Sequence, residues 1–224
     1  MKNILLLGST GKTGTEVLNL ALAKGYHVKA LVRDKGNVRV KSGNLTLIIG
    51  TPVNINDVRA IGSFEAVIST LGHPFNPDPN VSADRNSPTM MADSIKNVIT
   101  VMKEKGIRRI ILQTGAGAGD SYNRMPVTLQ RMITDSGLKN AYLDHDAQEK
   151  LVMNSGLEWT IVRPVGMTDN EGGAISILKG QVRRSHSIGR KNVAKFLLGC
   201  LETEEFIGKA VIIAETSSRP NISY

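Results

Sequence analysis

The chain has 224 residues, a formal net charge of +8 and a single cysteine, Cys200. This length suits one large α/β domain with a core of its own. A single cysteine excludes an intrachain disulfide, and no apolar run reaches the ~18 residues of a membrane span. Because only 4% of the residues are aromatic, stacking platforms for bases are scarce, and we interpret the positive charge as a solvated basic surface rather than a nucleic-acid interface.

The first predicted strand and the turn after it, residues 3–14 (NILLLGSTGKTG), are the most informative part of the sequence. A continuous apolar run is typical of a strand buried on both faces in a parallel sheet. Three glycines follow at three-residue spacing, and then the apolar side of a helix. We expect Gly8 to allow a sharp turn, Gly11 to leave room for a pyrophosphate, and Gly14 to let the helix pack closely.

This glycine-rich turn predicts a phosphate-binding site, because the N–H groups and dipole of the following helix would face an anion. It is not a Walker A loop, since only three residues separate Gly8 from Lys12. The alternative is a tight strand–helix turn that binds nothing. The residues expected to hold the pyrophosphate are Gly8, Ser9, Thr10, Gly11, Lys12, Thr13 and Gly14.

A second predicted strand, residues 27–32, ends at Arg33 and Asp34. At this position of a dinucleotide-binding fold an acidic residue binds the free 2′-hydroxyl of NAD, whereas an arginine accommodates the 2′-phosphate of NADP. Arg33 favours NADP(H), although Asp34 would repel a phosphate if its side chain turned inward. The alternative is that Arg33 is only a surface charge.

Strands and helices alternate along the rest of the chain, which predicts an α/β fold: a Rossmann-type doubly wound parallel sheet flanked by helices. A short strand at residues 175–178 would belong to a small C-terminal appendage on the substrate side. We expect a single domain, residues 1–224. The other predicted strands are residues 45–49, 66–69, 109–112, 159–162 and 210–214, and the helices are 56–61, 90–105, 141–154 and 190–201.

Several loops follow the predicted strand ends, where ligands bind in such folds. His73 can titrate near neutrality, but its place before Pro74 favours an ordinary loop residue. Residues 74–79 form a proline-rich loop that could serve as a lid or rim. The glycine-rich stretch 115–121 either permits close approach of a backbone or flat ligand, or is a flexible loop. Cys200 lies in an apolar setting that predicts packing rather than reactivity.

The motifs together resemble the atypical short-chain dehydrogenase/reductases of the NAD(P)-binding, NmrA-like group, and within it the flavin reductase/biliverdin reductase B type. The matching segments extend over nearly the whole chain: residues 7–14 (LGSTGKTG), 31–34 (LVRD), 69–72 (STLG), 144–150 (DHDAQEK), 155–164 (SGLEWTIVRP) and 187–194 (SIGRKNVA).

The resemblance implies a nicotinamide cofactor and a set of residues for its second half. Thr70 and Leu71, with Gly72, would line the path to the nicotinamide ribose. Thr114 and the turn Pro164, Val165 and Gly166 would flank the nicotinamide, and Thr51 would stand at the adenine end, where the family usually has aspartate.

The chain departs from short-chain dehydrogenases at the Tyr-x-x-x-Lys pair, because Asp146 occupies the tyrosine position relative to Lys150. The residues left as catalytic candidates are Thr114, Lys150 and His145. His145 is also open to interpretation as a plain surface residue, and it does not form a dyad with Asp144, because adjacent residues on a helix point about 100° apart.

The sequence therefore predicts an NADPH-dependent oxidoreductase that transfers hydride to a flavin such as FMN, a quinone or a similar conjugated small molecule, without a strong acid residue. The alternative is a non-catalytic NADP(H) sensor of the NmrA type. We expect a cytoplasmic protein without signal peptide, membrane contact or metal site, acting as a monomer or weak dimer with a small-molecule acceptor as partner; nucleic acid is not expected.

Overall fold

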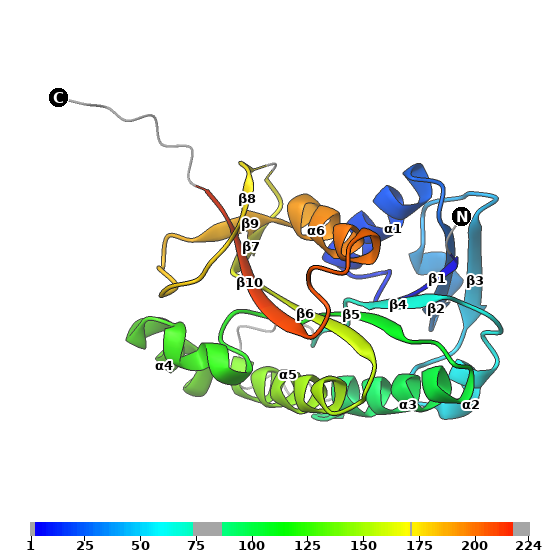
Figure 1. The fold of residues 1–224 in the computed structure, drawn as a ribbon, viewed down its shortest axis with the longest axis horizontal. Helices are drawn as coiled ribbons and strands as arrows, with labels where there is room; N and C mark the ends of the chain where they lie inside the picture. Colours follow the sequence, from blue (N-terminus) through cyan, green and yellow to red (C-terminus); the bar gives the residue numbers. More distant parts are fainter. Residues whose placement is uncertain (1–2, 74–86, 171, 217–224) are drawn as a thin grey trace.

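The computed structural model describes residues 3–73, 87–170 and 172–216, and it arranges them around one central sheet (Figure 1). The predicted loop at residues 74–79 and most of the C-terminal tail lie outside these ranges. Within the described ranges, no helix combines the length and apolar composition needed to cross a membrane.

The main sheet has eight strands in the order β3-β2-β1-β4-β5-β6-β10-β8. All neighbours run parallel except β8, which pairs antiparallel with β10 at the edge. A second, two-stranded parallel sheet joins β7 to β9. The strands are β1 (Asn3–Leu7), β2 (His27–Val32), β3 (Leu45–Ile49), β4 (Ala66–Ser69), β5 (Arg109–Gln113), β6 (Glu158–Pro164), β7 (Gly166–Thr168), β8 (Ile175–Ile177), β9 (Ser187–Gly189) and β10 (Lys209–Glu215).

Helices cover both faces of the main sheet (Figure 1). One face carries α1 and α6, and the other carries α2, α3 and α5, with α4 beside α5. This arrangement confirms the predicted Rossmann-type fold. The helices are α1 (Lys12–Ala23), α2 (Ile55–Arg59), α3 (Met90–Glu104), α4 (Val127–Thr134), α5 (Leu138–Met153) and α6 (Arg190–Glu202), with short 3-10 turns η1 (Lys35–Asn37) and η2 (Gly119–Arg124).

The continuous apolar run of β1 is explained by two hydrophobic cores, one on each face of the sheet. Ile4 and Leu6 pack in the core with α1 and α6, whereas Leu5 and Leu7 pack in the core with α3. All four side chains are fully buried. Because successive strand residues point to opposite faces, a strand covered on both sides needs apolar residues throughout.

Several details differ from the sequence-based expectations. The strand at 175–177 exists, but it extends the main sheet instead of standing in an appendage. The apolar pattern of such a short segment indicates a strand without specifying its partner. Helix α4 was not predicted, and α5 begins at Leu138 rather than near residue 141.

The strand order indicates which part of the sheet is expected to bind a ligand. The order reverses between β1 and β4, since the chain proceeds outward from β1 to β3 on one side and from β4 to β6 on the other. In open parallel sheets, ligands bind at the carboxyl ends of the strands across such a reversal. The loops after β1, β2, β4 and β5 therefore border the expected site.

Candidate functional site

The glycine-rich turn between β1 and α1 has the geometry that its sequence predicts. Gly8 has φ +79, in the left-handed region that favours glycine. A Cβ at Gly8 would lie 2.7 Å from the carbonyl oxygen of Thr70, and a Cβ at Gly14 would clash with the Gly8 carbonyl oxygen. The turn is therefore closed against β4 and against the start of α1 by close backbone packing.

The N-terminus of α1 is open at this turn. Its N-cap residue is Gly11, and no side chain caps the helix. A Cβ at Gly11 would approach only the Gly8 carbonyl oxygen, at 3.3 Å. The first N–H groups of a helix that lack side-chain acceptors provide partners for an anion.

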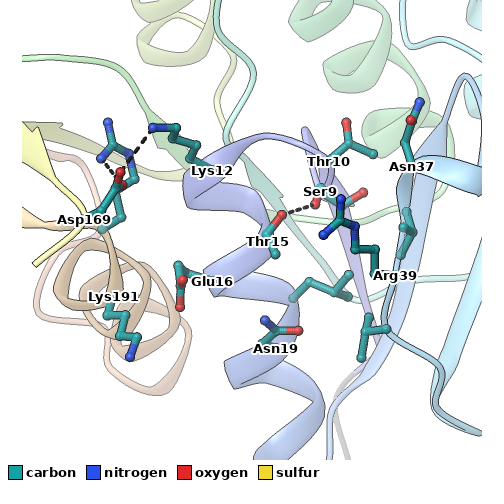
Figure 2. A pocket seen from close by; sticks show the side chains of 14 residues that line it. Ser9, Thr10, Lys12, Thr15, Glu16, Asn19, Asn37, Arg39, Asp169 and Lys191 are labelled. Carbon is teal, nitrogen blue, oxygen red and sulfur yellow. Dashed lines mark hydrogen bonds and ion pairs between the residues drawn. The ribbon is translucent and has the colours of Figure 1, made fainter. Parts of the chain in front are cut away.

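The hydroxyl groups of the turn have separate roles. The side-chain oxygen of Ser9 is buried and has no hydrogen-bond partner among the described residues, which is a costly state unless a ligand or water satisfies it. Thr15 donates to the Ser9 carbonyl oxygen at 3.2 Å (Figure 2). Thr13 is directed instead to the Met167 sulfur at 3.7 Å, so its hydroxyl faces β7 rather than the cavity.

A cavity of about 760 Å³ lies beside the turn (Figure 2). Its lining includes Ser9 and Thr10 from the turn and four basic side chains, Lys12, Arg39, Arg190 and Lys191. The unpartnered Ser9 hydroxyl, the open helix N-terminus and the basic lining fit a phosphorylated ligand. The sequence interpretation missed Arg39, which lies in the loop after η1 and belongs to no motif.

An acidic residue joins two of these cations. Asp169, just after β7, accepts from Lys12 Nζ at 3.1 Å (Figure 2). It also pairs with Arg190 at the start of α6. The hydrogen bond from Lys12, together with the charge of Arg190, lowers the pKa of Asp169. The Asp169 carboxylate therefore links the glycine-rich turn, β7 and α6.

The end of β2 leaves Arg33 exposed while Asp34 is engaged elsewhere. The Asp34 carboxylate accepts from the Gly36 N–H at 2.8 Å and caps η1. An inward-turned Asp34, which would repel a phosphate, is therefore not the observed state. At the end of β3, the Thr51 N–H donates to Asp57 of α2 at 2.8 Å, so a carboxylate stands near the position where the family usually has an aspartate.

On the other side of the strand-order reversal, Thr70 attaches the end of β4 to the glycine-rich turn between β1 and α1. Its hydroxyl donates to the Leu7 and Gly8 carbonyl oxygens at 3.0 and 3.3 Å. Leu71 is half-buried and Gly72 is exposed. The two halves of the expected site are therefore joined directly through Thr70.

Thr114 and the turn after β6 lie together at the same edge. The Thr114 N–H donates to Val162, and the Ala116 N–H donates to Pro164, both at 2.9 Å. Val165 is buried, whereas Gly166 is exposed. The predicted pairing of Thr114 with the Pro164–Gly166 turn is thus a real adjacency, and their contact with a nicotinamide remains a prediction.

The Thr114 hydroxyl donates to a fully buried ion pair that the sequence interpretation missed. It reaches Glu149 Oε1 at 2.6 Å. Glu149 accepts two bonds from Arg163, at 3.0 and 2.6 Å, and Arg163 also pairs with Asp120 at 2.6 Å. Both partners of the central pair are 2% exposed, so Thr114 is held in one orientation.

Helix α5 also holds the glycine-rich loop after β5. Tyr142 donates to the Ala116 carbonyl oxygen at 3.0 Å, and the Gly119 N–H donates to Asp146 at 2.6 Å. A Cβ at Gly117 would lie 3.1 Å from the Tyr142 ring. The small residues are therefore explained by close packing against α5 side chains, and neither a flexible loop nor a ligand is needed.

The other two catalytic candidates lie away from Thr114. Lys150 is exposed and lines a groove between α3 and α5 together with Lys96 and Lys103. His145 is partly buried rather than a plain surface residue, with Gln148 2.7 Å from Nδ1 and the Tyr142 ring edge-on at 5.8 Å. Burial, together with the charge of nearby His73, lowers the pKa of His145 to about 4.

Fold and site together define a Rossmann-type dinucleotide-binding domain, and comparison with known proteins agrees. A family model described as NAD(P)H-binding matches residues 8–204. The chain belongs to this NAD(P)H-binding family. It is 21% identical over 224 residues to the chloroplastic divinyl chlorophyllide a 8-vinyl-reductase of Cucumis sativus. The alignment covers 94% of this chain and 52% of that protein, so the chain spans about half the length of this relative.

Solved structures show the same fold. A short-chain dehydrogenase/reductase from Veillonella parvula in complex with NADP has a TM-score of 0.78 at 18% identity, covering 98% of this chain and 99% of that one. ChuY, described as an anaerobillin reductase from Escherichia coli O157:H7, has a TM-score of 0.78 at 21% identity, covering 97% and 99%. The resemblance to NAD(P)-binding reductases that the motifs indicated is confirmed.

Proposed function

We propose that this protein is an NADPH-dependent reductase that transfers hydride to a conjugated small-molecule acceptor, such as a quinone or a flavin. The observation that carries the proposal is the phosphate turn: an open helix N-terminus and a buried, unpartnered Ser9 hydroxyl border a cavity with four basic side chains. Such a site suits the anionic half of a dinucleotide, and membership of the NAD(P)H-binding family supports the same reading.

The preference for NADPH over NADH rests on the end of β2. Arg33 follows β2, the position that meets the adenosine ribose in such folds, and Arg39 lines the cavity beside the glycine-rich turn. Asp34, which could bind a free 2′-hydroxyl or repel a phosphate, is occupied by the Gly36 N–H. Two guanidinium groups and a withdrawn carboxylate favour a 2′-phosphate.

The proposed nicotinamide half lies across β4 and β5. NADPH, when bound, supplies the hydride. In the proposal, Thr70 and Leu71 line the path of the ribose, and Thr114 with the Pro164–Gly166 turn flanks the ring. The hydrogen bond from Thr114 to buried Glu149 fixes this wall of the site, and orientation of the reactants is the contribution that a protein makes to such chemistry.

A conjugated acceptor is proposed because the chain lacks the Tyr-x-x-x-Lys pair, and Lys150 faces the α3–α5 groove. Hydride addition to a quinone or flavin gives a delocalised anion, which needs less help from a strong acid. Several relatives are named reductases. The position of Lys150 also favours a second candidate, an NADP(H) sensor that binds the dinucleotide without turnover.

Purified protein mixed with NADPH and FMN, riboflavin or a simple quinone tests the proposal, with absorbance followed at the nicotinamide band. Consumption of NADPH that depends on the acceptor supports the reductase. Tight NADPH binding without consumption by any acceptor would favour the sensor, and no binding of either dinucleotide would contradict both functions.

Replacing Arg33 with Asp should separate the two dinucleotides. We expect a loss of NADPH affinity of about 10- to 100-fold, corresponding to one charge-assisted contact, with NADH changed by less than about threefold on the same scale. Calorimetric titration with both dinucleotides measures the effect. Arg131→Asp on α4 is the control, since it makes the same change of charge at a distant exposed position. An equal loss for NADH would contradict the role of Arg33.

A further inference from the structure

A histidine–carboxylate contact lies at the same sheet edge, four residues after β4 ends. His73 Nε2 lies 2.9 Å from Asp144 Oδ2. The Asp144 carboxylate is fully buried and also accepts the N–H groups of Met91 and Ala92, each at 2.8 Å, at the start of α3. These contacts on one buried carboxylate fix it in place.

This contact sets the tautomer of His73. Asp144 already accepts two N–H groups of α3, so we assign the hydrogen of the His73 contact to Nε2, which leaves Nδ1 as the second functional atom of the ring. Nδ1 has no hydrogen-bond partner within residues 3–73, 87–170 and 172–216. A carboxylate that orients an imidazole and stabilises its protonated form is the arrangement that general acid–base chemistry uses.

The position of His73 relative to Thr114 follows from α5. Asp144 holds His73 and Glu149 holds Thr114, and five residues correspond to a rise of about 7.5 Å along a helix. Both loop ends are therefore attached to neighbouring turns of the same helix. His73 follows β4 and Thr114 follows β5, and these strands are adjacent. His73 thus lies at the same carboxyl edge of the sheet as Thr114, with its side chain 9% exposed.

We propose that His73, oriented by Asp144, is the proton donor that completes reduction of the acceptor, replacing the missing tyrosine. This inference rests on the proposed reductase function. The acceptor takes a hydride, that is two electrons and one proton, from NADPH and becomes an anion. The Nδ1 proton of the His73 imidazolium then passes to that anion, leaving a neutral imidazole and NADP⁺, and solvent returns one proton to the ring.

The surroundings of His73 suit this role. The titratable groups that face it among the described residues are Asp144 and His145, both from α5, while α3 contributes the N–H groups that hold Asp144. Burial and the proximity of His73 lower the pKa of His145 to about 4. At neutral pH, His145 is therefore uncharged and does not compete for the proton.

The first test compares His73→Asn with His27→Asn, a matched change at the start of β2, on the opposite edge of the sheet. With a quinone as acceptor, we expect His73→Asn to lower kcat about 100-fold or more, and His27→Asn to leave it unchanged. The NADPH dissociation constant should stay within about twofold in both variants. The decline of wild-type kcat at high pH, where the donor loses its proton, should disappear in His73→Asn.

The second test needs no turnover. Nitrogen-15 spectra of the protein without dinucleotide, recorded at high pH where the histidine rings are neutral, should show the Nε2–H tautomer for His73. Asp144→Asn should weaken that preference, because one amide oxygen cannot serve the imidazole and both N–H groups of α3. If His73→Asn proves unstable, His73→Gln repeats the kinetic test with a longer side chain. It leaves the bonds between Asp144 and α3 in place.

The outcomes separate this inference from the proposed function. Wild-type turnover with a His73→Asn kcat within about threefold of wild type, an unchanged pH profile, or an Nδ1–H tautomer overturns the role of His73 and leaves the reductase standing. Absence of wild-type turnover with every acceptor overturns the reductase, and with it the proton donor.

Discussion

Glu149 connects a buried charge to a residue of the proposed site. Its carboxylate receives Arg163 through two hydrogen bonds and the Thr114 hydroxyl through a third. With both ions almost without solvent contact, removing one partner leaves the other charge poorly compensated, which costs more than the pair itself contributes.

Glu149→Gln should therefore lower the free energy of unfolding by about 3 kcal/mol, with Arg163 retaining only Asp120. Urea denaturation measures this value. The control is Glu158→Gln, which breaks a pair with Arg108 at the surface and should cost less than about 1 kcal/mol. Equal losses in the two variants would mean that the buried pair has no special cost.

Residue types alone predicted some positions well and others poorly. Cys200 is buried in the core with α1 and α6, which confirms its predicted packing role, and this burial raises its pKa to about 12. The contacts of His73 and Glu149 could not be predicted because their partners, Asp144 and Thr114, are 71 and 35 positions away in the chain. Sequence patterns show local periodicity and turn chemistry, whereas contacts between distant residues depend on the finished fold.

At the scale of single elements, the β1–α1 turn depends on two glycines for different reasons. Gly8 needs a positive φ, and Gly14 needs the absence of a side chain, because a Cβ there would clash with the Gly8 carbonyl oxygen and lie 2.8 Å from Thr70 Oγ1. Gly199, inside α6, has no atom within 4 Å of an added Cβ.

Gly14→Ala and Gly199→Ala should have opposite effects on the free energy of unfolding. We expect a loss of about 2 kcal/mol at Gly14, where overpacking distorts the turn, together with at least a ~10-fold loss of NADPH affinity, about 1.4 kcal/mol. At Gly199 we expect a gain of about 0.5–1 kcal/mol, because alanine is the better helix former. Denaturant titration and calorimetry measure both. Undiminished NADPH binding by Gly14→Ala would mean that the turn is not the phosphate site.

The elements themselves were predictable where their patterns were long. Most strands of the main sheet and the helices α1, α3 and α6 follow from apolar runs, periodicity and terminal glycines. Helix α5 shows the limit: Glu149 reaches Thr114, while neighbouring Lys150 lies in the α3–α5 groove. Successive helix residues point about 100° apart, so the motif comparison could select Lys150 while the contact with Thr114 belongs to the residue beside it.

At the scale of the whole molecule, the two cores lie on opposite faces of one continuous sheet. We accordingly propose that the chain unfolds as a single domain. Burial holds the pKa of His145 at about 4, below its ordinary value of 6.5. Between these values the unfolded chain takes up a proton that the folded protein refuses, so stability falls as the pH is lowered through this window.

Unfolding in urea should therefore show one transition. His145 alone should make the free energy of unfolding about 2 kcal/mol lower at pH 5 than at pH 7. His145→Gln should reduce that pH difference by the same amount, while the remaining groups keep their own contributions. Paired denaturation curves of wild type and variant at both pH values provide the measurement. A pH difference that is identical in the two proteins would contradict a neutral, buried His145.

The Asp144 carboxylate accepts the first N–H groups of α3 and, in our proposal, also orients His73, the proton donor. Architecture and reactivity then share a single carboxylate, so a lineage could not adjust one without disturbing the other. A library screened only for yield of intact protein would accordingly preserve this aspartate even in the absence of any substrate, whereas His73 would drift freely until turnover itself was selected.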